Sequence, residues 1–168
     1  MNIETIEDLF GFQLQHAYYA ERTQVELLSE LATDAADAGN DALEQALSTH
    51  REETEQHVDR LERVFAALGR RPRASRSQIV DELAAARRDD LHPESDAPDP
   101  PPLETALLAE RFESRTYEML VRLAGRLAYA DDVVDPLEAI LADERAMCAT
   151  LEDLEDGFAM AQPRREEA

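Results

Sequence analysis

Acidic and histidine residues interrupt the apolar stripes of four predicted helices, in each case close to the middle of the helix. A helix packed in a bundle is expected to be apolar along the stripe that faces its neighbours. Extending each stripe at helical spacing leads instead to side chains that can bind a metal ion. These candidate ligands are Glu21 in the first helix, His50, Glu53 and His57 in the second, Glu110 and Glu113 in the third long helix, and Glu144 in the last.

Antiparallel packing would bring these side chains to about one level of the bundle, where uncompensated carboxylates cost several kcal/mol each. Two divalent cations would balance the charge of four carboxylates, and imidazoles would add neutral nitrogen ligands. Such a mixture of oxygen and imidazole ligands suits iron or manganese, and also zinc. Glutamates on two helices combined with Glu/His pairs on two others form the di-metal carboxylate pattern of four-helix bundles. Proton uptake by the carboxylates remains the metal-free alternative.

The apolar periodicity predicts that nearly the whole chain is helical. The segment between the second and third long helices contains a predicted short helix, from about Ser75 to Arg88, and a proline-rich linker over residues 89–102. Asp135 and Pro136 form a helix-start signal for the last helix, because aspartate caps helices and proline suits the first turn. The four long helices are predicted over residues 5–36, 42–68, 103–129 and 135–158.

The lengths of the connections predict the topology. Short gaps at residues 37–41 and 130–134 make each flanking pair of helices an antiparallel hairpin, and the long excursion over residues 69–102 joins the two hairpins. This is an all-α, ferritin-like four-helix bundle with one long crossover that contains a short extra helix. We expect one domain over residues 1–160, followed by a disordered tail over residues 161–168.

Composition excludes several classes of protein. No apolar run approaches the ~18–20 residues of a membrane helix, and the acidic N-terminus does not resemble a secretory signal, so we expect a cytoplasmic protein with no membrane partner. One cysteine, Cys148, excludes an internal disulfide framework. A net charge of −21 would repel duplex nucleic acid, so no nucleic-acid partner is expected.

The basic residues have an unusual composition, because all 17 of them are arginine and none is lysine. An acidic sequence without lysine that still contains 43% hydrophobic residues resembles proteins of salt-accumulating halophiles, here of an archaeal type. In molar salt the screening length falls to about 3 Å, so a charge of −21 becomes tolerable. The alternative is an ordinary acidic protein from a GC-rich genome.

Two helices carry motifs that resemble those of the YciE/YciF-like stress proteins, a ferritin-like branch also described as the DUF892 type. The first motif contains Leu14, Tyr18 and Glu21, and the second is His50-x-x-Glu53-Thr54 followed by Arg-Leu-Glu. Weaker similarity covers Glu110, Glu113 and Tyr117 in the third long helix and Glu144 in the last. Three positions depart from the family pattern: Arg111 replaces a histidine, Cys148 an aspartate, and His57 a frequent glutamine.

The resemblance implies a dimerising bundle, a di-iron-type site and an association with stress responses. The ligands that it implies are Glu21, His50, Glu53, Glu110, Glu113 and Glu144. The predicted function is a di-metal carboxylate stress protein with oxidase- or peroxidase-like chemistry. The alternative is a metal-free structural or protein-interaction module, in which the inner polar residues form a hydrogen-bonded network and Arg111 serves as a counter-ion.

Overall fold

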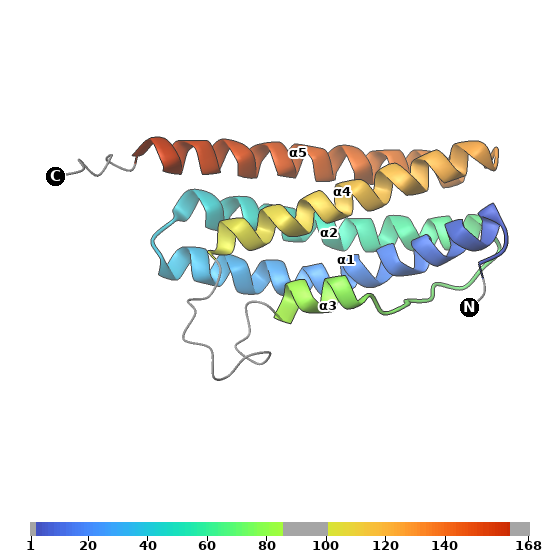
Figure 1. Cartoon of the computed structure of the whole chain (residues 1–168), viewed down its shortest axis with the longest axis horizontal. Helices are drawn as coiled ribbons and strands as arrows, with labels where there is room; N and C mark the ends of the chain where they lie inside the picture. The colour runs from blue at the N-terminus through green and yellow to red at the C-terminus, as the bar shows by residue number, and fades with distance from the viewer. Residues whose placement is uncertain (1–2, 86–100, 162–168) are drawn as a thin grey trace.

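The computed structural model describes residues 3–85 and 101–161, without the side chains of residues 158–161, and shows only helices in these ranges (Figure 1). Within them no helix is long and apolar enough to cross a membrane. The predicted linker over residues 89–102, apart from Pro101 and Pro102, and the predicted tail, apart from Ala161, lie outside the described residues. The helices are α1 (Ile6–Asp37), α2 (Asp41–Ala67), α3 (Gln78–Ala85), α4 (Pro102–Arg126) and α5 (Asp131–Ala161).

The four long helices form one bundle, which confirms the predicted fold class. Helices α1 and α2 form one antiparallel hairpin, and α4 and α5 form the other (Figure 1). The hairpins pack through α2 against α5 and α1 against α4, so the four helices enclose a single interior. The short helix α3 lies on the outside, in contact with both α1 and α4. The crossover therefore covers one of the two seams between the hairpins.

Local signals in the sequence explain where these helices begin and end. Thr5 caps α1 by accepting a hydrogen bond from the Asp8 amide, and the Asp8 carboxylate accepts one in return from the Thr5 amide. Gly39 and Gly69 follow α1 and α2 with φ angles of 72° and 67°, in the left-handed region that glycine adopts without strain. Ala128 takes the same role after α4 with φ 50°.

Helix α5 begins earlier than predicted, at Asp131 instead of Asp135, and Pro136 lies inside it. The prediction that Pro136 marks the first turn is therefore wrong. The amides of Val133 and Val134 donate to the Ala130 carbonyl, and Val133 is only 3% exposed, so burial of this turn favours the longer helix. Pro136 lacks an amide hydrogen and so removes one hydrogen bond from the second turn of the helix.

The apolar core consists of two clusters, which lie on either side of a polar layer. One cluster lies towards the start of α1 and contains Phe10, Leu61 and Tyr117. The other lies towards the end of α1 and contains Leu28, Leu47 and Met147. Apart from Thr105, which lies beside the second cluster, the buried polar and charged residues of the long helices lie between these clusters along the chain: Glu21, Gln24, His50, Thr54, His57, Glu110, Glu113 and Glu144.

Candidate metal centre

The four long helices place six of the seven sequence-predicted ligands in one buried layer. Each lies on a stripe whose other members are core leucines, so the packing that buries the leucines also buries these polar groups. Glu21, His57, Glu110 and Glu144 are fully buried, and His50 and Glu113 are at most 3% exposed. The two hairpins thus bring together carboxylates and imidazoles that are far apart in the sequence.

Two clusters, each of two glutamates and one histidine, share Glu144. In the first, His57 Nδ1 lies 2.9 Å from Glu144 Oε1 and 3.4 Å from Glu21 Oε2. In the second, His50 Nε2 lies 3.0 Å from Glu110 Oε2 and 3.4 Å from Glu144 Oε2. Within each cluster, three potential ligand atoms lie within 4.8 Å of one another. Glu144 therefore offers one carboxylate oxygen to each cluster, as expected of a ligand shared by two ions.

The hydrogen bonding of these groups fits metal ligation better than a closed protein network. His50 Nε2, His57 Nδ1 and both oxygens of Glu110 and Glu144 are buried and lack a hydrogen bond of acceptable geometry to any described residue. They approach one another as closely as 2.9 Å, but the ring N–H directions do not meet the carboxylate oxygens. Buried polar atoms are normally hydrogen-bonded, and these groups, whose lone pairs lack such partners, could hold a metal ion.

The outer nitrogen of each imidazole faces a carboxylate outside the clusters. His50 Nδ1 lies 3.2 Å from Glu53 Oε2, and His57 Nε2 lies 3.2 Å from Asp143 Oδ2. Metal-binding histidines commonly donate their second N–H to a carboxylate, which fixes the tautomer and leaves the inner nitrogen free for the metal. Asp143 also accepts a hydrogen bond from Arg60 at 2.5 Å. Sequence reasoning missed Asp143, although it directly precedes the ligand Glu144.

Glu53 does not join either cluster, contrary to the expectation from its motif. Its side chain is 45% exposed and its carboxylate contacts the outer side of the His50 ring. Three residues of helix separate Glu53 from His50 by about 60° around the axis, whereas seven residues bring His57 back to within about 20°. The structure therefore places Glu53 outside the two clusters, in contact with the outer nitrogen of His50.

The pKa values of the clustered groups reflect burial and close opposite charges. Burial lowers the pKa of His50, but Glu110 and Glu144 outweigh it and raise this pKa to about 12. Burial likewise lowers the pKa of His57, and Glu144 and Glu21 together raise it to about 10. Burial and the charge of Glu144 raise the pKa of Glu110 to about 8. Although burial alone would raise it, the two histidines hold the pKa of Glu144 below its usual range.

Two further polar contacts complete the layer. Tyr117, 1% exposed, donates a hydrogen bond to Glu21 Oε1. Gln24 Nε2 donates to Glu113 Oε2 at 2.6 Å, and Glu113 Oε1 has no hydrogen-bond partner among the described residues. Burial, followed by the charges of Glu21, Glu144 and Glu110, raises the pKa of Glu113 well above its usual value. Glu113 thus borders the clusters without belonging to either.

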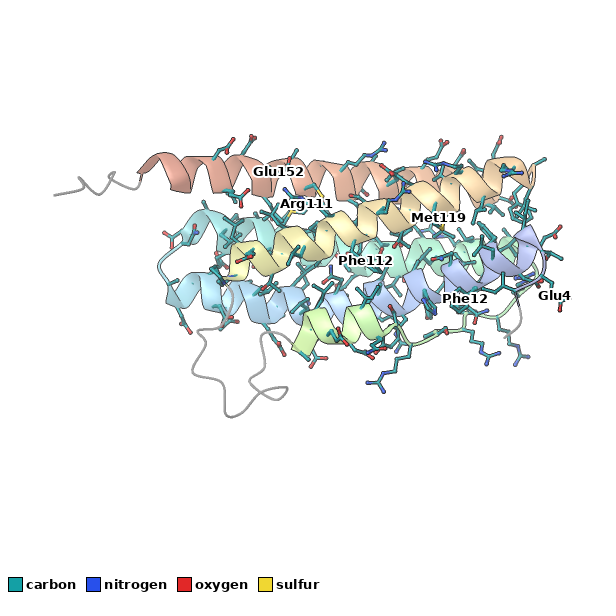
Figure 2. All side chains as sticks on the ribbon, in the orientation of Figure 1. Glu4, Phe12, Arg111, Phe112, Met119 and Glu152 are labelled. Carbon is teal, nitrogen blue, oxygen red and sulfur yellow. The ribbon has the colours of Figure 1, made fainter. Side chains whose placement is uncertain are left out.

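Arg111 lies outside the centre, so it is not a counter-ion for any buried glutamate. Its side chain is 54% exposed and its guanidinium pairs with Glu152 at 3.0 Å, along the outer edge of α4 and α5 (Figure 2). Cys148 is half-buried beside Ser114, with the two side-chain atoms 3.5 Å apart. In the metal-free alternative, Arg111 therefore cannot serve as the counter-ion of the buried glutamates.

The fold and this layer define a class: a four-helix bundle with a buried centre of carboxylates and imidazoles suited to divalent metal ions. The chain belongs to the family described as "Domain of unknown function (DUF892)", which it matches over residues 5–162. It is 28% identical to Protein YciF of Escherichia coli strain K12 over 159 residues, which is 92% of each chain.

Two solved structures share the fold. The crystal structure of the E. coli stress protein YciF matches with a TM-score of 0.81 and 25% identity, covering 95% of this chain and 100% of that one. YcfI from Rhodopseudomonas palustris, provisionally described as a structural protein, matches with a TM-score of 0.78 and 29% identity, covering 90% of this chain and 95% of that one. Both likenesses extend over nearly the whole bundle.

Proposed function

We propose that this chain is a ferritin-like di-metal carboxylate protein that binds two iron ions and acts in stress responses with oxidase- or peroxidase-like chemistry. One observation above all supports the proposal: Glu144 offers one oxygen to each of two buried clusters that also contain a histidine and a second glutamate. Two ferrous ions bound there would supply electrons for the reduction of O₂ or a peroxide. The name of the stress protein YciF supports the physiological setting.

The side chains of this chain have separable roles in the proposal. Glu144 would hold both ions, with Glu21 and His57 completing one site and Glu110 and His50 the other. These carboxylates, with Glu113, balance two divalent charges in an interior that tolerates net charge poorly. Glu53 and Asp143 orient the imidazoles from outside. The leucine-rich clusters on both sides of the layer exclude bulk water.

The metal content of purified protein tests this function against the metal-free structural or interaction module. We expect the chain, purified without chelator and loaded anaerobically with Fe(II), to bind two ions per chain by elemental analysis. Manganese or zinc in place of iron would preserve the site and change the chemistry. His57→Ala should bind one ion, because it disrupts only one cluster. His16→Ala is the matched control, since His16 stacks on Phe12 away from the centre. Wild-type protein that stays free of metal would contradict the proposal.

We also propose that the protein is a cytoplasmic homodimer. Phe12 and Phe112, two aromatic residues off the main apolar stripes, are both partly buried within the chain: Phe12 stacks on His16, and Phe112 lines a crevice beneath α3 (Figure 2). Ile79 and Leu108 are 56% and 50% exposed, and they are better candidates for a contact between copies. Sedimentation in molar KCl should show a dimer, and a monomer at micromolar concentration would contradict this.

A further inference from the structure

Helix α3 covers the seam between α1 and α4 directly over one side of the metal centre. Val80 and Leu83 of α3 line a crevice together with Gln24 and Glu113. Val80 is 6% exposed, so the apolar face of α3 packs inward on this seam. Glu113 is the acidic group of the centre that borders the crevice, and its free oxygen Oε1 has no hydrogen-bond partner among the described residues.

A larger cavity lies next to the crevice and shares lining residues with it. The outer cavity has a volume of about 660 Å³, and its charged lining consists of three acidic side chains, Glu26, Asp81 and Glu82, and two arginines, Arg22 and Arg76. Thr23 and Leu27 line both spaces, so the crevice and the cavity are neighbours on the α1 side of α3. The crevice itself measures about 10 Å³, which is space for no more than one water molecule. A hydrated divalent cation, which carries several waters, cannot pass it unless α3 moves.

One aspartate holds α3 in place. Asp81 accepts a hydrogen bond from the hydroxyl of Tyr19 on α1 and a second from Arg76 Nε, 2.5 Å from Asp81 Oδ2. The preceding connector is tied to the same helix, because the Ser75 amide donates to the Gln15 carbonyl at 3.0 Å. These contacts lie at the surface, where Arg76 is 79% exposed. Among the described residues, local opening of α3 would break few hydrogen bonds and would leave the four long helices intact.

The opposite approach, between α4 and α5, is unfavourable for cations. A surface cavity of about 330 Å³ leads there to Cys148, and Arg111, Arg115 and Arg145 line it. These three guanidinium groups outnumber the two carboxylates that also line this cavity, Glu118 and Glu152, with which they form ion pairs. In the cavity beside α3 three carboxylates outnumber two arginines, so that side repels a divalent ion less. Electrostatics therefore favour the path beneath α3.

We propose that divalent cations reach the metal centre through the seam between α1 and α4, that Glu113 is their first buried protein ligand, and that α3 is a cover released through Asp81. The inference rests on the proposed di-metal function. It gives Glu113 a role in ion uptake, since this residue belongs to neither ligand cluster. Gln24, hydrogen-bonded to Glu113, positions the carboxylate at the inner end of the crevice.

Stopped-flow mixing of the metal-free full chain with Co(II), followed by visible absorbance, tests the proposal, with stoichiometry measured by equilibrium dialysis. Asp81→Ala should accelerate binding about two- to tenfold, the effect of losing one or two surface hydrogen bonds. Hydrogen exchange of the amides in α3 should accelerate with it. Tyr19→Phe removes the hydrogen bond to Asp81 without changing the charge of the protein. It should also accelerate both Co(II) binding and hydrogen exchange in α3. Glu113→Gln should slow binding roughly tenfold and still bind two ions.

Glu118→Gln and Glu152→Gln are the matched controls, because each removes one surface carboxylate paired with arginine near the α4–α5 cavity. Both should bind Co(II) at the wild-type rate. Wild-type rates for Asp81→Ala or for Glu113→Gln would overturn the proposal, as would a Glu113→Gln variant that binds only one ion. Wild-type chain that binds no Co(II) would instead refute the di-metal function itself, so the two failures are distinguishable.

Discussion

Tyr117 on α4 donates a hydrogen bond to Glu21 on α1, and both side chains are buried in the polar layer. Burial and the nearby charge of Glu21 raise the pKa of Tyr117 well above its usual value, so the phenol stays protonated and remains a donor. The second oxygen of Glu21 faces His57 at 3.4 Å. One neutral hydrogen bond therefore fixes the carboxylate plane and directs its other oxygen towards the cluster.

Tyr117→Phe should destabilise the metal-free protein by about 1–3 kcal/mol, because it leaves a buried carboxylate oxygen without its donor. Urea unfolding of variant and wild type measures the change. Tyr18→Phe is the matched control, since its hydroxyl donates to Glu62 in a partly exposed position and should cost less. Equal losses for the two variants would show that Tyr117 contributes only packing.

Glu53→Gln should retain both metal ions, whereas Glu144→Gln should lose both. Glu53 lies outside the clusters with 45% of its side chain exposed, and Glu144 contributes to each of them. Glu53→Gln should still weaken binding about 10–100-fold, because the orienting carboxylate of His50 is gone. Calorimetric titration with Zn(II) gives both stoichiometry and affinity. If Glu53→Gln bound one ion fewer than the wild type, Glu53 would be a direct ligand.

The metal-free protein should lose stability as the pH rises from about 6.5 towards 10. The folded state raises the pKa of His57 to about 10 and that of His50 to about 12, above the unfolded value near 6.5. A raised histidine pKa stabilises the fold fully below the unfolded value, and this contribution disappears as the pH rises through the folded one. Glu110, with its pKa raised to about 8, acts in the same direction, since the fold favours its protonated form.

Metal-loaded protein should show the opposite trend, because bound metal requires neutral imidazoles and binding releases protons. Thermal unfolding across this pH range, with and without Zn(II), measures both curves. In metal-free protein, His57→Gln should reduce the loss of stability between pH 6.5 and 10, because one of the two titrating histidines is gone. A metal-free midpoint that does not change with pH would contradict the assignment of protonated histidines.

The melting midpoint should be several degrees higher in molar KCl than in dilute buffer. The chain carries a net charge of −21, and lowering the salt from 1 M to 0.1 M lengthens screening from about 3 Å to about 10 Å. Sucrose at matched osmolality is the control, since excluded solutes stabilise proteins without screening charge. Equal midpoints in high and low KCl would contradict adaptation to a salt-rich cytoplasm.

The helices and their hairpins could be predicted because local signals determine them. Leucine stripes at steps of three and four define the buried faces, and Gly39 and Gly69 mark helix ends that need a positive φ. The start of α5 could not be located in this way. Pro136 suits a first turn, but the burial of Val133 against the rest of the core decides the outcome, and that is a tertiary effect.

The polar layer was predictable for the same reason, since the face and depth of Glu21, His57 and Glu144 follow from single helices. Glu53 was predicted to join the ligands because it lies one turn from His50 and shares its motif, and the structure leaves it outside the two clusters. The contact of Asp143 with His57 depends on the register between α2 and α5. The position of α3 over Glu113 depends on the path of the crossover. No periodicity within one helix contains that information.

Each ligand cluster takes its side chains from both hairpins: Glu21 and His57 from α1 and α2, and Glu144 from α5. A divalent ion held there would act as a reversible cross-link between segments near opposite ends of the chain. Cross-links that close long loops restrict the unfolded chain the most. Separation of the hairpins would then require release of the ion, so the lifetime of the folded chain would depend on the metal supply of the cell.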